Sequence, residues 1–198
     1  MQEIFDKLQE SNVPASALLQ GVNVVFADES DETLDMFRSV MGPLGWHGTY
    51  VHSAVEIIDT VNAMLEQNQP IDAVVADINY LSGPRVTGIT AAREIRRAMP
   101  NVPIIFITSY VTSMIKEEVR RVNAEIFSKP FDLEGLFIQL AQLIYWNRLA
   151  NNNSYEGHDR RRNSVNRTAN ARRVTDTTIS TPDRIIQTIR ELHIKEQH

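Results

Sequence analysis

Five polar side chains stand where short apolar runs of the chain end, and together they could carry out one kind of chemistry. Asp28 and Glu29, Asp77, Thr108 and Lys129 follow the runs at residues 22–27, 73–76, 104–107 and 124–128. Carboxylates brought together repel one another unless a cation lies between them, and hard oxygen ligands favour Mg²⁺. An ammonium and a hydroxyl group can bind phosphoryl oxygens while a carboxylate attacks the phosphorus atom. These residue types therefore predict a phosphoryl-transfer site that binds Mg²⁺.

The apolar runs have the character of buried parallel strands, because they are continuous rather than alternating. Strands are expected at 22–27, 50–51, 73–76, 104–107 and 124–128, and segments of helical period at 31–41, 54–65, 90–99, 113–122 and 132–146. This alternation predicts an α/β fold, a flavodoxin-like (βα)5 doubly wound parallel sheet between two helix layers. Ligands bind such sheets at the carboxyl ends of the strands, where all five polar side chains fall.

The charge distribution divides the chain into an acidic body and a basic tail. Residues 151–198 carry nine Lys or Arg and six Asp or Glu, whereas residues 1–150 carry 11 and 19. We expect an N-terminal helical extension at 1–20, a globular domain at 21–150, a polar and basic linker at 151–180, and an amphipathic helix at 181–198. In that last helix Thr181 is the expected N-cap, Pro182 takes the first helical position, and Ile185, Ile186, Ile189 and Leu192 form the apolar stripe.

The composition also restricts the cellular setting. The chain contains no cysteine, so disulfides and thiol chemistry are excluded. Its first residues include Glu3 and Asp6 and lack the long apolar core of a signal peptide. No run approaches the roughly 18 apolar residues that a membrane span needs. We expect a cytoplasmic protein that does not enter the membrane.

The order Asp-Glu, Asp, Thr, Lys-Pro on a (βα)5 pattern resembles the receiver domain of two-component response regulators, such as the chemotaxis regulators. The resemblance covers about residues 22–150. It implies that Asp77 is the phosphoacceptor, taking a phosphoryl group from the phosphohistidine of a sensor kinase or a phosphotransfer protein. It also implies that Asp28, Glu29, Asp77 and the backbone carbonyl of Asn79 hold Mg²⁺.

The same resemblance assigns roles to the later strands. Thr108 would bond to the phosphoryl group, Lys129 would pair with the phosphoryl group or with Asp77, and Pro130 would follow a cis peptide bond. The family usually has an aromatic residue three positions before the lysine, where this chain has Ile126, with Phe127 beside it. The loop after Asp77 is about three residues longer than is usual in the family and lacks its usual proline, and the acidic pair is Asp-Glu rather than Asp-Asp.

These observations predict a signalling switch rather than a metabolic enzyme. Phosphorylation would change protein–protein contacts through the face made by the fourth helix, fifth strand and fifth helix, which could also form a homodimer. The alternative is a DNA-binding transcriptional regulator, dimeric, that contacts nucleic acid through six arginines of the tail: Arg160, Arg161, Arg162, Arg167, Arg172 and Arg173. A phosphatase with an aspartyl nucleophile is set aside, because it would need a carboxylate at the position of Asn79.

Overall fold

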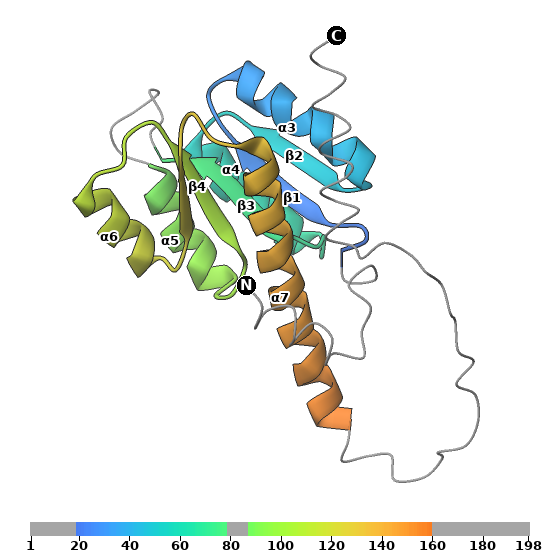
Figure 1. Ribbon diagram of the computed structural model, residues 1–198. Helices are drawn as coiled ribbons and strands as arrows, with labels where there is room; N and C mark the ends of the chain where they lie inside the picture. Colours follow the sequence, from blue (N-terminus) through green and yellow to red (C-terminus); the bar gives the residue numbers. More distant parts are fainter. Residues whose placement is uncertain (1–18, 79–86, 160–198) are drawn as a thin grey trace.

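The computed structural model describes residues 19–78 and 87–159, with side chains described as far as Asn151. Five strands alternate with helices along the described chain (Figure 1). In chain order the elements are β1 (Asn23–Ala27), α3 (Asp31–Leu44), β2 (His47–Val51), α4 (Ala54–Glu66), β3 (Ala73–Asp77), α5 (Gly88–Ala98), β4 (Ile104–Thr108), α6 (Ser113–Arg121), β5 (Glu125–Ser128) and α7 (Leu133–Asp159). The predicted repeat of five strand–helix units is confirmed.

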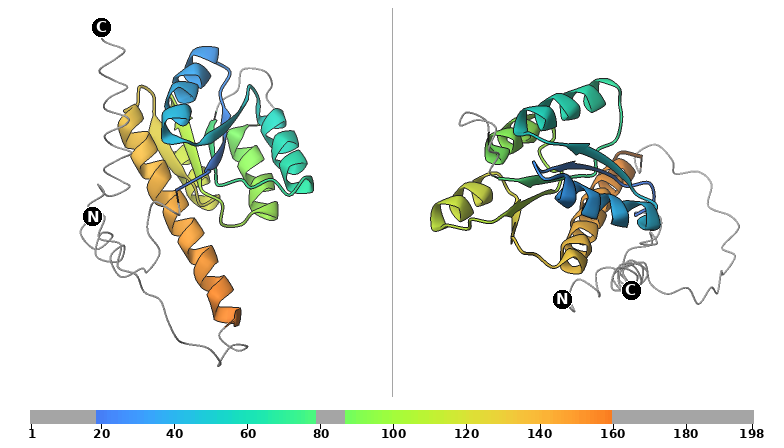
Figure 2. Two further views of the ribbon diagram at one scale, coloured as in Figure 1. Left: turned by 90° about the vertical axis from the view of Figure 1, so that its right-hand side faces the viewer. Right: turned by 90° about the horizontal axis from the view of Figure 1, so that it is seen from above.

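All strand pairs are parallel, and the strand order is β2-β1-β3-β4-β5. One apolar core lies between the sheet and helices α3 and α7, and a second lies between the sheet and helices α4, α5 and α6. Figure 2 shows these two helix layers on opposite faces of the sheet. The order of the strands reverses between β1 and β3, which is where ligands bind in doubly wound sheets. Asp28 directly follows β1, and Asp77 is the last residue of β3.

Local sequence signals explain where most helices begin and end. Ser30, Ser53, Thr87 and Thr112 each precede a helix and accept a hydrogen bond from the backbone N–H three residues later. Gly45 ends α3 in the left-handed conformation, with φ of 68°. Asp132 serves as the predicted cap of α7, since its carboxylate accepts from the backbone N–H groups of residues 134 and 135.

Strand β2 is longer than expected. The apolar signal covered only residues 50–51, but β2 begins at His47 and pairs with β1 over its whole length. Because β2 is an edge strand, its first residues are not buried on both faces, and they therefore lack a continuous apolar run.

Helix α7 also departs from expectation at its end. It continues to Asp159, past the predicted domain boundary at residue 150, so the first part of the predicted linker at 151–180 is helical. Asparagine is a weak helix former, but adding residues to an existing helix costs little, and no proline interrupts this stretch. The predicted N-terminal extension (all but residues 19 and 20), the rest of the linker and the predicted terminal helix lie outside the described residues. In the part of the chain that is described, no helix is long and apolar enough to cross a membrane.

An ion pair at the amino edge of the sheet holds α7 in place. Arg148 donates from Nε and Nη2 to the two carboxylate oxygens of Asp72, and each hydrogen bond is 2.6 Å long. The same carboxylate accepts from the backbone N–H of Asn23 at 2.8 Å, and Arg148 also donates to the carbonyl of Gln20. The pair therefore links α7, β1 and the residue before β3 at one point.

Candidate functional site

Three of the predicted site residues meet at the carboxyl edge of the sheet. Lys129 Nζ donates to Asp28 Oδ2 at 2.6 Å and to Asp77 Oδ2 at 2.8 Å. Asp28 follows β1, Asp77 ends β3 and Lys129 follows β5, so the contacts join segments that are 52 and 101 residues apart in the chain. One ammonium group thus lies between two carboxylates, as the charges of these residues require.

Asp28 is the most firmly held of the three. Its side chain is only 3% exposed, and its Oδ1 accepts the backbone N–H of Ser30 at 2.9 Å. The backbone N–H of Asp28 continues the β1–β2 ladder by donating to the carbonyl of Val51. The direction of this carboxylate is therefore fixed by the βα loop that also caps α3.

The two carboxylates determine the electrostatics of Lys129. Burial alone lowers the pKa of Lys129, but its hydrogen bonds to Asp28 and Asp77 and their negative charges outweigh that effect. The pKa of Lys129 is therefore raised above its ordinary value, so the side chain is an ammonium ion at neutral pH. The backbone N–H of Lys129 donates to the carbonyl of Thr108, which extends the β4–β5 pairing to the site. The Lys129–Pro130 peptide bond is cis, as expected.

Thr108 lies on the strand beside Asp77. The register of β3 and β4 places Asp77 opposite Ile107, so Thr108 is one residue further toward the carboxyl edge. Its side chain is buried, and its hydroxyl oxygen accepts the backbone N–H of Tyr110 at 3.2 Å and approaches the Tyr110 carbonyl at 3.5 Å. The Tyr110 side chain itself is 70% exposed. Sequence reasoning did not single out Tyr110, although its position two residues after Thr108 could have suggested a turn.

A close backbone contact shapes the other side of Asp77. Helix α5 begins at Gly88, whose N–H donates to the carbonyl of Ile78 at 3.1 Å. A Cβ atom built at Gly88 would stand 2.3 Å from the carbonyl oxygen of Asp77 and 3.2 Å from the Cα of Ile78. Gly88 therefore allows the start of α5 to lie directly against the backbone of Asp77, a role that its sequence position alone did not reveal.

The acidic residues of the site suit Mg²⁺. Within the described ranges no three histidines, aspartates or glutamates form a group that would hold a metal by themselves. Mg²⁺ binds proteins through one or two carboxylates and keeps several waters, so the adjacent carboxylates of Asp28 and Asp77 fit its requirements. Glu29 is partly exposed directly after Asp28, and Asn79 lies outside the described residues.

Strand β5 places Ile126 and Phe127 on opposite faces of the sheet. Ile126 packs with the core under α4, α5 and α6, whereas Phe127 packs with the core under α3 and α7. Successive side chains of a strand point to opposite faces, so Phe127 cannot take the place of Ile126. The face of β5 toward α6 therefore carries an aliphatic residue.

Comparisons with known proteins agree with this geometry. The family model described as "Response regulator receiver domain" matches residues 22–141. The sensor kinase CckA of Brucella abortus is 25% identical over 140 residues, 69% of this chain and 14% of that protein. The response regulator MprA of Mycobacterium bovis is 25% identical over 126 residues, 62% of this chain and 50% of MprA. The chain thus spans half or less of the length of these two relatives.

Solved structures show the same fold. A response regulator receiver protein from Sinorhizobium medicae is 29% identical, with a TM-score of 0.56 over 65% of this chain and 98% of that one. The receiver domain of the sensor histidine kinase PA1611 from Pseudomonas aeruginosa is 22% identical, with a TM-score of 0.52 over 63% of this chain and 98% of that one. The PA1611 structure has a magnesium ion coordinated in its active-site cleft.

Proposed function

The chain belongs to the response regulator receiver family, and on this premise we propose that it is the response regulator of a two-component phosphorelay in which Asp77 accepts the phosphoryl group. The observation that supports this assignment best is the Lys129 ammonium group, which bonds to both Asp77 and Asp28 at the carboxyl edge of the sheet. It orients one oxygen of Asp77 and brings a positive charge to the place where phosphoryl oxygens would arrive.

The donor in this proposal is a phosphohistidine of a sensor kinase or a phosphotransfer protein. A carboxylate oxygen of Asp77 forms a bond to phosphorus as the P–N bond to the donor histidine breaks, and the histidine nitrogen keeps that electron pair and takes up a proton. Asp28, Glu29, Asp77 and the backbone carbonyl of Asn79 would hold Mg²⁺, which when bound supplies positive charge to the phosphoryl oxygens. Attack of water on phosphorus later restores the carboxylate and releases inorganic phosphate.

The residues around Asp77 would register its phosphorylation. The new phosphoryl oxygens compete with Asp77 Oδ2 for Lys129, and they compete with the Tyr110 backbone for the Thr108 hydroxyl. If Thr108 turns toward the phosphoryl group, the backbone N–H of Tyr110 loses its partner and the β4–α6 loop rearranges. This loop leads into α6, which together with β5 and α7 forms the face expected to change its contacts.

The output is proposed to be protein–protein contact rather than catalysis on a metabolic substrate. The face formed by α6, β5 and α7 serves a partner or a second copy of the chain in this proposal. The six arginines of the alternative DNA-binding hypothesis lie outside the described residues.

Mass spectrometry tests the acceptor assignment. Incubation with acetyl phosphate and Mg²⁺ should add about 80 Da, the mass of one phosphoryl group, and the Asp77→Asn variant should gain nothing. Asp59→Asn, which changes an exposed aspartate of α4, is the matched control and should be modified like the wild type. An adduct that persists in Asp77→Asn, or no adduct in the wild type, would show that Asp77 is not the acceptor.

A further inference from the structure

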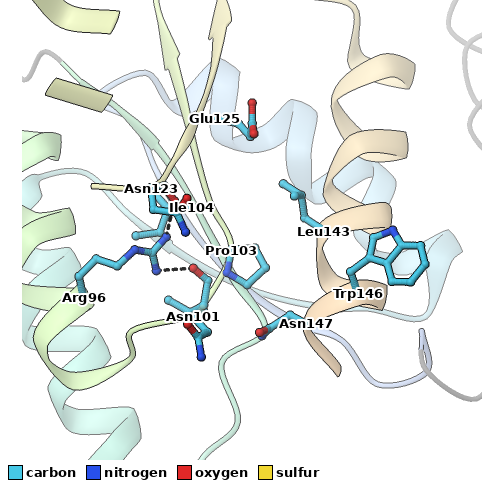
Figure 3. A pocket seen from close by; sticks show the side chains of 10 residues that line it. Arg96, Asn101, Pro103, Ile104, Asn123, Glu125, Leu143, Trp146 and Asn147 are labelled. Atoms are coloured by element: carbon cyan, nitrogen blue, oxygen red, sulfur yellow. Dashed lines mark hydrogen bonds between the residues drawn. The ribbon is translucent and has the colours of Figure 1, made fainter. Parts of the chain in front are cut away.

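A pocket of about 290 Å³ lies at the amino edge of the sheet, on the opposite side of the domain from Asp77. It is bounded by the starts of β4 and β5, by Arg96 near the end of α5, and by the middle of α7 (Figure 3). Leu143, Trp146 and Asn147 line it from α7, and Asn101, Pro103 and Asn123 line it from the segments before β4 and β5 (Figure 3). Of the lining residues, Val102, Pro103 and Ile104 are buried, whereas Asn101, Asn123 and Glu125 are exposed.

Hydrogen bonds hold the walls of this pocket in position. Arg96 donates from Nε to the carbonyl of Val122 at 2.8 Å and from Nη2 to the carbonyl of Asn123 at 2.7 Å. It also donates to the carbonyl of Val102, just before β4. Arg96 thereby joins the ends of α5 and α6 to the start of β4, so the pocket is formed without help from a ligand. With its guanidinium group directed to carbonyl oxygens, Arg96 is not arranged to bind an anion.

The sequence of residues 181–198 has the pattern that such a pocket can accept. Ile185, Ile186, Ile189 and Leu192 fall on one side of a helix of this length, and Ile194 falls away from that stripe. A helix this short is marginal in water unless its apolar side is covered. Arg190 is adjacent to the stripe, and Glu125 is an exposed carboxylate at the pocket.

This pocket lies closer to Asp159, the last described residue, than the exposed apolar residues at the carboxyl edge do, and a tethered segment docks more readily at the nearer site. From Asn147, which lines the pocket, to Asp159 the helix advances about 18 Å. The 21 residues at 160–180 can span up to about 70 Å, so they return to the pocket easily. Tyr110 and Met114 lie at the other edge of the sheet, further from Asp159 by about 21 Å, the length of α7 between Leu133 and Asn147.

We propose that residues 181–198 dock as a helix on this pocket of their own chain, with the stripe from Ile185 to Leu192 against the partly exposed side chains of Leu143 and Trp146. Because the tether keeps the segment close, weak docking is enough to populate the bound form. The pocket is bounded by β5 and α7, so the docked segment covers part of the face expected to bind partners. This inference does not depend on phosphorylation of Asp77.

Paramagnetic NMR on the full chain tests the docking. The chain contains no cysteine, so Gln187→Cys provides a single site for a nitroxide label on the side of the helix away from the stripe. Docking predicts that the side-chain amide signals of Asn101, Asn123 and Asn147 broaden and recover when the nitroxide is reduced. The backbone amide of Thr112, at the carboxyl edge, should be unaffected.

Matched substitutions separate docking from chance proximity. Adding Ile189→Asp should abolish the broadening, whereas Ile194→Asp, the same change off the stripe, should preserve it. The proposal would be overturned if the asparagine signals do not broaden, if other residues broaden most, or if the broadening survives Ile189→Asp. A mixed sample tests docking between chains: ¹⁵N-labelled chains without nitroxide are observed in the presence of unlabelled chains that carry it. If the asparagine signals broaden there as strongly as in the sample where one chain carries both labels, the proposal is overturned and a second copy of the chain is the occupant.

Discussion

The contact between Gly88 and Asp77 allows a quantitative test of how the acceptor is positioned. In Gly88→Ala the new Cβ would lie 2.3 Å from the carbonyl oxygen of Asp77, whereas ordinary contact begins near 3.4 Å. The two groups must therefore separate by about 1 Å, and a backbone carbonyl cannot rotate away as a flexible side chain can. Either the start of α5 or the end of β3 must move.

This displacement should reduce both stability and reactivity. Overpacking of this kind costs about 1–3 kcal/mol, partly offset by the better helix propensity of alanine. A misplacement of about 1 Å at a reacting group can slow a reaction by up to about 100-fold. We therefore expect Gly88→Ala to unfold at lower urea concentration and to be phosphorylated by acetyl phosphate at least about tenfold more slowly, as followed by mass over time.

Gly42→Ala is the matched control, because Gly42 lies within α3 and a Cβ there has no atom within 4 Å. This variant should be more stable than the wild type by about 0.5–1 kcal/mol and should react at an unchanged rate. If Gly88→Ala behaves like Gly42→Ala in both assays, the close contact does not position Asp77 and the reasoning fails.

Two further predictions concern the charged groups. Because the pKa of Lys129 is raised in the folded state, its contribution to stability is complete below its unfolded pKa of about 10.4 and is lost as pH rises through the folded value. Urea unfolding should therefore show wild-type stability falling above about pH 10.5 more steeply than that of Lys129→Met, and equal slopes would contradict the assigned ion pairs. Arg148→Met should lower the free energy of unfolding by about 2–3 kcal/mol, because it leaves the buried Asp72 carboxylate without its bidentate partner. Arg120→Met is the control, since Arg120 belongs to an exposed ion pair, and it should change the free energy of unfolding by less than about 0.5 kcal/mol. Equal effects of the two substitutions in the same unfolding assay would show that the Asp72–Arg148 pair does not hold α7.

Most of the fold was predictable because the central strands are buried on both faces. Strands β1, β3 and β4 appear in the sequence as unbroken apolar runs, and the polar residue that ends each run identified the carboxyl edge. The site followed from the same rule, since parallel strands bring their carboxyl ends together. Asp28, Asp77 and Lys129 are in contact as charge complementarity required.

The parts that sequence did not reveal depend on contacts between distant segments. Nothing near Gly88 in the chain shows that its missing Cβ makes room for the Asp77 carbonyl. The pair of Asp72 and Arg148 joins residues 76 positions apart, and neither stands in a motif. The length of α7 could not be predicted, because no strong stop signal marks the end of the helix. The polar residues at this end have the composition of a linker as much as that of a solvent-exposed helix.

The Asp72–Arg148 contact also has a mechanical meaning. Helix α7 starts four residues after Lys129, is pinned to the amino edge of the sheet at Arg148, and extends beyond that point to Asp159. A helix held at this one ion pair can tilt as a rigid body about Arg148. The part of α7 from Leu133 to Arg148 is about 22 Å long, and the part from Arg148 to Asp159 is about 16 Å long, at 1.5 Å per residue. If the helix tilts about Arg148, a displacement beside the phosphorylation site reappears at Asp159 with about 0.7 of its size and the opposite sense.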